Sequence, residues 1–156
     1  NPNISPVTYG TGGRALPGSI TAARAVIANR QPNAIIVHAW SPNAGVSDEI
    51  IGKSLSATVD LINYAARNGI KTIVCTPIPW QYTGANLTLW QKLVSSVRNL
   101  RGCIIADITA VLEDPAAPGQ LLAAYRGTAG DIQSYHPNPL GKYAQAQVIA
   151  SAAAEV

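Results

Sequence analysis

Four residues of this sequence could together support acyl-transfer chemistry. His136 lies in a polar segment with Asp131 five positions before it, and a loop histidine oriented by a carboxylate can act as a general base. Asn43 and Gly13 lie in turn-like segments, and a side-chain amide with a backbone N–H can stabilise an oxyanion. Each residue also has a simpler interpretation, as a surface histidine, a loop acid, a turn asparagine or a turn glycine. In combination they predict the equipment of a serine esterase, without the serine itself.

The apolar run 34–39 is the element that would position Asn43. It predicts a strand buried on both faces, as in a parallel sheet, with His38 as a hydrogen-bonded core residue. Ser41-Pro42 ends the strand, because proline lacks an N–H and restricts the residue before it. Asn43 therefore follows the strand's carboxyl end, where ligands collect in open parallel sheets.

Strand-like and helix-like segments alternate along the chain, with no internal repeat and no linker. This alternation predicts parallel strands joined by right-handed helical crossovers, with helices on both faces in three α/β/α layers. Ser47 before two acidic residues predicts a helix start, and Asn68-Gly69 predicts its end. The expected elements are an extended segment at 6–9, helices at 17–30, 47–68 and 86–100, strands at 34–39, 71–76 and 103–107, a weak helical patch at 118–125, a loop at 127–139 and a closing helix at 140–156.

Length and composition favour one well-packed domain. The 156 residues suffice for a core, and 47% hydrophobic with only 12% charged residues argues against disorder. The net charge is +3 with a pI near 9.0, but the basic residues are scattered singly, so we expect no nucleic-acid surface. No apolar stretch is long enough to predict a membrane span.

Two tryptophans and two cysteines stand near the predicted strand ends. Trp40 and Trp80 could line an acyl or sugar pocket, and packing of aromatic side chains at strand ends is an equal alternative. Cys75 and Cys103 lie in apolar runs and are predicted to be buried free thiols, because their spacing matches no zinc or redox motif. No cluster of His, Cys and Asp has ligand spacing, so neither a metal nor a cofactor is predicted.

The order of these segments resembles the SGNH (GDSL-like) hydrolase superfamily. That family carries a Gly-Asp-Ser nucleophile after the first strand, a glycine after the second, Gly-x-Asn-Asp after the third and Asp-x-x-His before the last helix. Here Gly10-Thr-Gly-Gly13 is similar to the second block, Trp40-Ser-Pro-Asn43 to the third and His136-Pro-Asn138 to the fourth. The resemblance spans nearly the whole chain and implies a flavodoxin-like SGNH fold. It also implies His136 as base, Asp131 as the acid that orients it, and Gly13 and Asn43 as oxyanion donors.

The sequence departs from the family pattern in three respects. Ser41 and Ala44 replace the glycine and aspartate of the third block. Gln133 lies three residues before His136, and Asp131 lies two residues farther upstream. No Gly-Asp-Ser occurs anywhere, although the family order places one ahead of the Gly-rich turn.

The missing block leads to a prediction about the whole protein. In the implied strand order 2-1-3-4-5, the first strand lies between the second and the third. Without it, backbone hydrogen bonds are unmade at two strand edges, at roughly 1–3 kcal/mol for each buried group. We therefore expect residues 1–156 to form a single domain that is the C-terminal part of a longer protein. The first strand and its serine would lie on an upstream segment or a second chain.

The resemblance implies hydrolysis of an oxygen ester of a small molecule or carbohydrate, such as a sugar acetyl group. An alternative is a catalytically inactive SGNH-fold domain that binds a carbohydrate or a surface, which the residues at Ala44 and Gln133 favour. A flavodoxin-like ligand-binding or regulatory domain is a second alternative.

Overall fold

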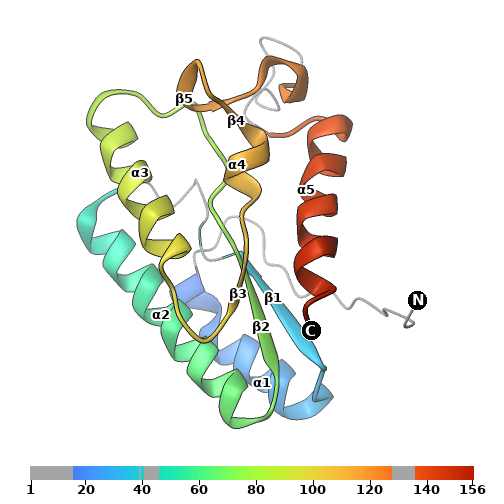
Figure 1. The fold of residues 1–156 in the computed structure, drawn as a ribbon. Coiled ribbons are helices and arrows are strands. Elements are labelled where there is room, and N and C mark those ends of the chain that lie inside the picture. Colours follow the sequence, from blue (N-terminus) through green and yellow to red (C-terminus); the bar gives the residue numbers. More distant parts are fainter. Residues whose placement is uncertain (1–15, 39, 41–45, 128–135) are drawn as a thin grey trace.

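A three-stranded parallel sheet lies at the centre of the protein. The computed structural model describes residues 16–38, 40, 46–127 and 136–156. The strands β1 (Ala34–His38), β2 (Lys71–Cys75) and β3 (Ile104–Ala106) are ordered β1-β2-β3. Their carboxyl ends gather at one end of the molecule, which is the top of Figure 1. The predicted parallel sheet and the order of its three strands are confirmed.

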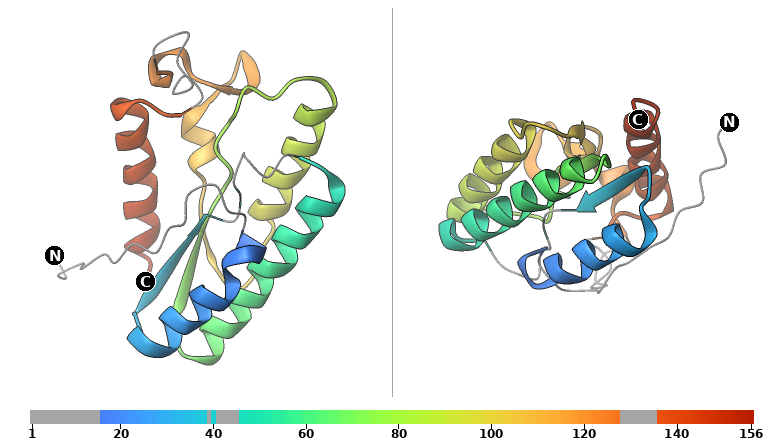
Figure 2. Two further views of the ribbon diagram at one scale, coloured as in Figure 1. Left: turned by 180° about the vertical axis from the view of Figure 1, so that it is seen from behind. Right: turned by 90° about the horizontal axis from the view of Figure 1, so that it is seen from below.

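Three helices cover one face of this sheet. They are α1 (Ile20–Arg30), which follows the 3-10 turn η1 (Leu16–Ser19), α2 (Asp48–Arg67) and α3 (Gly84–Arg98). Figure 2 shows them on one side of the strands. The core between them and the sheet consists of Ile27, Val37, Trp40, Ile51, Leu61, Ile62, Ala65, Ile70, Val74, Leu93 and Val97.

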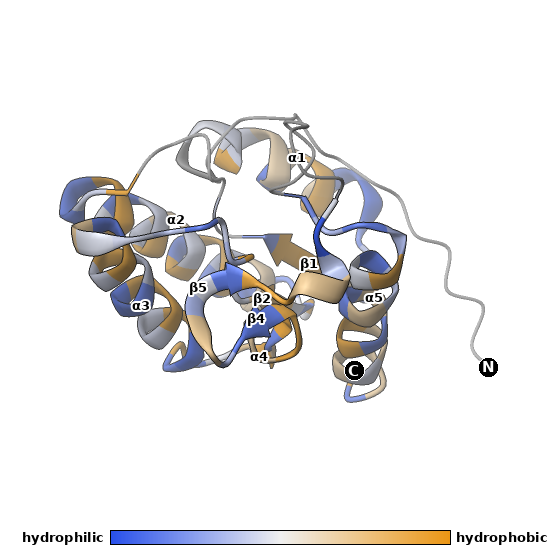
Figure 3. Ribbon diagram, turned by 90° about the horizontal axis from the view of Figure 1, so that it is seen from above, coloured by the Kyte–Doolittle hydropathy of each residue, from blue (hydrophilic) through white to orange (hydrophobic). Residues whose placement is uncertain are grey.

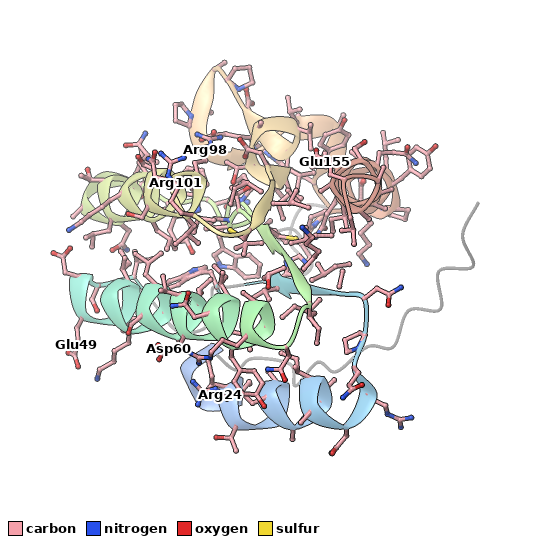
Figure 4. The ribbon with its side chains drawn as sticks, turned by 60° about the horizontal axis from the view of Figure 1, so that its bottom comes forward. Arg24, Glu49, Asp60, Arg98, Arg101 and Glu155 are labelled. Atoms are coloured by element: carbon pink, nitrogen blue, oxygen red, sulfur yellow. The ribbon has the colours of Figure 1, made fainter. Side chains whose placement is uncertain are left out.

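The contact between α1 and α2 also includes a cation and an aromatic ring. Arg24 of α1 extends toward α2, where its guanidinium carbon lies 5.3 Å from the centre of the Tyr64 ring (Figure 4). A cation at this distance from a ring face is attracted by the ring quadrupole. The pair therefore adds a cation–π interaction to the contact between α1 and α2.

One long helix, α5 (Pro139–Ala153), covers the opposite face over β2 and β3. The closing helix that we predicted at 140–156 is confirmed, with α5 beginning one residue earlier and ending three residues earlier than predicted. The short helix α4 (Ile108–Leu112), which the sequence did not predict, also contacts α5. Buried residues of this second core are Ile73, Cys75, Ala106, Ile108, Leu112, Leu121 and Ala152. The three layers of the predicted fold are therefore present, with unequal cover on the two faces.

The termini of α2 follow the predicted capping signals. The Ser47 hydroxyl accepts a hydrogen bond from the Ile50 N–H at 3.2 Å, and two acidic residues occupy the first turn. Gly69 follows the helix with φ of +71°, a conformation that favours glycine. The predicted start and end of this helix are confirmed.

The weak helical patch that we predicted at 118–125 is wrong. Residues Glu113–Asp114 (β4) and Ala117–Leu121 (β5) form an antiparallel hairpin, and only Ala123–Tyr125 (η3) form a 3-10 turn. Gly119 has φ of +82°, and its N–H donates to the Glu113 carboxylate at 2.7 Å. Positive φ and a cross-strand side-chain acceptor stabilise the hairpin over a helix, which needs negative φ throughout.

The prediction that the 34–39 strand is buried on both faces is also wrong. Among the described residues β1 pairs with β2 alone, and Ile36 is 52% exposed. His38 is exposed at the carboxyl end of β1, so its prediction as a core histidine is wrong as well. Val37 packs in the core on the side of α1 and α2, whereas no helix of the described residues buries Ile36 on the other face.

The two cysteines follow the prediction in part. Cys75 ends β2 and is buried, and desolvation raises the pKa of its thiol to about 12. Cys103 precedes β3 and is half-buried, with a raised pKa from the same cause. Both are free thiols. Among the helices of the described ranges, none is long and apolar enough to cross a membrane.

Candidate functional site

Two predicted site residues meet at the carboxyl end of the sheet. Trp80 lies in the connection between β2 and α3, and His136 lies just before α5. Their ring centroids are 4.8 Å apart with an interplanar angle of 82°, an edge-to-face contact. Residues 56 positions apart in sequence thus come together at the edge where parallel α/β sheets bind ligands.

The segment that carries His136 is fixed by the residue two positions after it. The Asn138 carboxamide oxygen accepts a hydrogen bond from the Gly141 N–H at 3.0 Å, so Asn138 is the N-cap of α5. Its Nδ2 donates to the Ala124 and Arg126 carbonyls at 2.8 and 3.0 Å. Asn138 therefore ties α5 to the η3 region and limits how far the histidine segment can move.

Close packing reinforces this attachment. A Cβ at Gly141 would lie 2.9 Å from the Pro137 Cβ and 3.0 Å from the Tyr125 Cβ. Real Cβ atoms do not tolerate such distances, so only glycine allows the first turn of α5 to approach η3 this closely. The sequence Asn138-Pro139 carries a helix-start signal, with an N-cap asparagine and proline at N1.

A hydrogen-bond network connects the start of the loop that carries Trp80 with the residues that follow β3. The Thr76 hydroxyl donates to the Asp107 carboxylate at 3.0 Å and accepts from the Thr109 N–H at 2.9 Å. The Thr109 hydroxyl donates to the Pro77 carbonyl at 2.6 Å. Arg98 binds the same carboxylate through two nitrogens, at 2.8 and 3.2 Å. This network joins the carboxyl ends of β2 and β3, and sequence reasoning missed it because its members lie far apart in the chain.

A buried aromatic group lies in the same loop region. Tyr82 stacks on Trp90 with ring centroids 5.8 Å apart. Burial raises the pKa of the Tyr82 phenol, and the nearby Trp40 indole offsets part of that rise. The Tyr82 hydroxyl and the Trp40 and Trp90 indole nitrogens are buried without a hydrogen-bond partner in the part of the chain that the structure describes. Trp40 is only 9% exposed, so it lies within the core at this end of the sheet.

His38 is the second histidine at the carboxyl end of the sheet. Although its side chain is exposed, surrounding protein atoms desolvate the imidazole and lower its pKa. No described side chain forms a hydrogen bond or ion pair with it. Because His38 also lies at the carboxyl end of the sheet, its substitution serves as a control for the substitution of His136.

The remaining predicted site residues lie outside the described ranges. These residues are Gly13, Asn43 and Asp131, together with the turn at 10–13. Their predicted roles therefore stay predictions, and the described site consists of His136, Trp80 and the groups that support them. Within the described ranges, no group of three or more His, Cys, Asp or Glu side chains is placed to hold a metal ion.

Comparison with known proteins supports the fold. No protein-family model and no curated protein sequence matches the chain. Among solved structures, the chain is similar to a protein of Bacteroides fragilis NCTC 9343 described as a "putative acylhydrolase". The match has a TM-score of 0.72 and 20% sequence identity, and it covers 92% of this chain and 72% of that one. The chain thus has the three-layer fold of this acylhydrolase structure.

Proposed function

We propose that this chain supplies the base and the oxyanion hole of a serine ester hydrolase. The observation that carries the proposal is the placement of His136 beside Trp80 at the carboxyl edge of a sheet with an acylhydrolase fold. A general base must lie on a well-held segment within reach of the group that it deprotonates. The Asn138 anchor meets the first requirement.

The proposed reaction has two steps. A serine hydroxyl gives its proton to His136 while its oxygen attacks the ester carbonyl, and His136 then protonates the departing alcohol as the C–O bond breaks. Water attacks the acyl-enzyme in the second step, with the same histidine as base and then as acid. Asp131 would orient the imidazole, and Asn43 with the Gly13 N–H would stabilise the tetrahedral oxyanion.

The nucleophile lies outside residues 1–156 in this proposal. None of the described serines lies in a strained strand-to-helix turn of the kind that presents a nucleophile. We therefore assign the serine to a segment upstream of this chain or to a second chain. The substrate is an ester of a small molecule or a carbohydrate, with Trp80 beside the acyl or sugar group, whereas Trp40 packs in the core.

The test of the proposed base compares substitutions of the two histidines at this end of the sheet, with His38 as the control for His136. The protein, with every polypeptide that accompanies it, is treated with a fluorophosphonate that reacts with activated serines. Intact masses then identify the labelled chain. We expect a label on a polypeptide other than residues 1–156 and a labelling rate at least 100-fold lower in His136→Gln, the typical size of a general-base effect. His38→Gln should label at the unaltered rate.

Two results would count against the proposal. Equal labelling of His136→Gln and the unmodified protein would show that His136 is not the base. No label in any polypeptide, with the fold intact by circular dichroism, would favour the second candidate function, an inactive domain that binds carbohydrate. The half-exposed Trp80 ring is the observation that favours this alternative, because aromatic rings bind sugars by stacking.

A further inference from the structure

Three buried hydrogen-bond donors without partners lie near one another at the carboxyl end of the sheet. They are the Tyr82 hydroxyl and the indole N–H groups of Trp40 and Trp90, and none has a partner in the ranges that the structure describes. Trp40, Tyr82 and Trp90 are 9%, 7% and 1% exposed. Tyr82 stacks on Trp90, and the Trp40 indole lies close enough to the Tyr82 hydroxyl to moderate the rise in the pKa of the phenol. Folded proteins leave few buried donors unpaired, so these three require a physical explanation.

Trp80 covers this group on the side of His136. It packs against the core cluster of Tyr82, Trp90 and Val94 and remains partly exposed, so its ring lies between that cluster and solvent. The same ring contacts the His136 imidazole edge to face. Displacement of Trp80 would therefore uncover the cluster that holds the Tyr82 hydroxyl, beside the proposed base.

The backbone next to Trp80 is strained. Among the described residues other than glycine, only Gln81 and Gln31 have positive φ, at +54° and +43°. Gln31 is the C-cap of α1, a position at which the left-handed conformation pairs the last carbonyls of a helix. Gln81 lies in the connection between β2 and α3, where no helix ends, and a residue with a Cβ is disfavoured there relative to glycine. A rotation that returns Gln81 to negative φ would release this strain.

Hydrogen bonds fix the loop on both sides of the strained residue. The Pro77 carbonyl accepts from the Thr109 hydroxyl at 2.6 Å, and the Tyr82 N–H donates to the Gly119 carbonyl of β5 at 3.2 Å. Figure 3 views the molecule from this end, with β5 beside the loop that leads to α3. Backbone rotation is thereby confined to residues 78–81, so it moves the covering tryptophan while the phenol stays in place.

We propose that the Tyr82 hydroxyl binds a hydroxyl or ring oxygen of a sugar in the substrate, and that rotation at Gln81 moves Trp80 aside to admit it. The inference rests on the proposed function, because it assigns the alcohol part of the ester to this loop. In the closed form the hydroxyl is buried without a partner among the described residues. In the open form the sugar oxygen accepts its hydrogen bond, so binding satisfies a donor that the closed form leaves unpaired.

The chemistry of the surrounding side chains favours a sugar over other alcohols. Indole N–H groups only donate, so the ligand must present acceptor oxygens, and none of the three donors carries a charge to select an anion. Aromatic rings such as that of Trp80 also pack against the apolar C–H face of a sugar. A sugar ring has both features, whereas a simple aliphatic alcohol has no further hydroxyl once it is esterified.

The test compares two acetate esters, a mono-acetylated methyl glucoside and ethyl acetate, in the protein with every polypeptide that accompanies it. Tyr82→Phe removes one oxygen and leaves the ring in place. We expect it to lower kcat/KM for the sugar ester relative to ethyl acetate by roughly 3- to 10-fold, through KM, the typical effect of one lost hydrogen bond. Calorimetric titration with the unacetylated methyl glucoside should show the same fold-change in Kd.

Gln81→Gly tests the rotation, and Gln31→Gly is its matched control at the other residue with positive φ. Glycine tolerates positive φ, so Gln81→Gly should stabilise the closed form and weaken glucoside binding by roughly 2- to 5-fold. Gln31→Gly should bind the glucoside as tightly as the unmodified protein does.

Four results would overturn the inference. They are an unaltered ratio of the two kcat/KM values in Tyr82→Phe, a Kd that Tyr82→Phe does not change, equal Kd values in Gln81→Gly and Gln31→Gly, and no binding of the glucoside by the unmodified protein. Glucoside binding that depends on the Tyr82 hydroxyl, without ester hydrolysis or serine labelling, would preserve this inference while removing the proposed function.

Discussion

Tyr82 and Thr109 are buried hydroxyl-bearing residues with opposite surroundings. The Thr109 hydroxyl donates to the Pro77 carbonyl, whereas the Tyr82 hydroxyl has no hydrogen-bond partner among the described residues. A buried polar group without a partner loses its interaction with water and receives nothing in return. The two side chains should therefore respond differently when their oxygen is removed.

We expect Tyr82→Phe to leave the free energy of unfolding unchanged or to raise it by up to about 1 kcal/mol. Thr109→Val, which has nearly the same shape, should lower it by about 1–3 kcal/mol, because it leaves the Pro77 carbonyl unpaired. Urea denaturation of both variants measures the difference. A loss in Tyr82→Phe as large as that in Thr109→Val would show that the Tyr82 hydroxyl has a partner in solution.

Single residues also show where sequence reasoning stops. Trp80 follows a strand end and His136 precedes a helix start, both of which the sequence marks clearly, and the structure brings the two residues into contact. His38 lies in an apolar run that looks like a core strand, but it is exposed because β1 has only one described neighbour. Burial of a strand residue depends on which elements lie beside it, and local sequence does not contain that information.

Among the elements, the start of α5 has the most direct connection to the candidate site. Asn138 caps the helix and binds two carbonyls near η3 through its side-chain nitrogen. We expect Asn138→Ala to lower the free energy of unfolding by about 1–3 kcal/mol, from the lost cap and the unpaired carbonyls. It should also slow fluorophosphonate labelling, because His136 lies two residues away.

Asn138→Asp separates these two contributions. It keeps the oxygen that accepts from Gly141 and loses the nitrogen that donates to Ala124 and Arg126. Its stability should lie between those of the unmodified protein and Asn138→Ala, as measured by thermal and urea denaturation. Because a carboxylate oxygen of Asp would face the Ala124 and Arg126 carbonyls, equal stability of Asn138→Asp and Asn138→Ala would show that this repulsion cancels the N-cap contribution.

Elements with strong end signals were predictable, and short elements were not. The bounds of α2 follow from Ser47 and Asn68-Gly69. The β4–β5 hairpin and the five-residue helix α4 escaped prediction because such segments have too few residues to show a periodicity. The hairpin instead depends on the positive φ of Gly119 and its bond to Glu113, neither of which a helical pattern search detects.

At the scale of the whole molecule, Cys75 can report on unfolding, because it lies in the core between α5 and the sheet. This thiol is 2% exposed in the α5-side core, and burial raises its pKa to about 12. Since the thiolate is the reactive form, iodoacetamide at pH 8 should modify it only when the sheet separates from α5. The half-buried Cys103 should react faster.

Alkylation followed by mass spectrometry at increasing urea concentrations measures both rates. The rate at Cys75 should follow the global unfolding transition, and the rate at Cys103 should rise earlier. Modification of Cys75 in native buffer as fast as that of Cys103 would contradict the tight packing between α5 and the sheet. The sequence predicted that a helical layer covers this face of the sheet. The reactivity of Cys75 therefore tests the packing of that layer as well as the burial of one thiol.

Asn138 is followed by Pro139, and this pairing bears on the lifetime of the protein. Asparagine deamidates mainly when the backbone nitrogen of the next residue attacks its carboxamide to form a succinimide. The proline nitrogen carries no hydrogen and cannot readily take part. The residue that fixes the histidine segment is thus protected from the most common chemical ageing of asparagine, and the attachment of α5 should last as long as the folded chain.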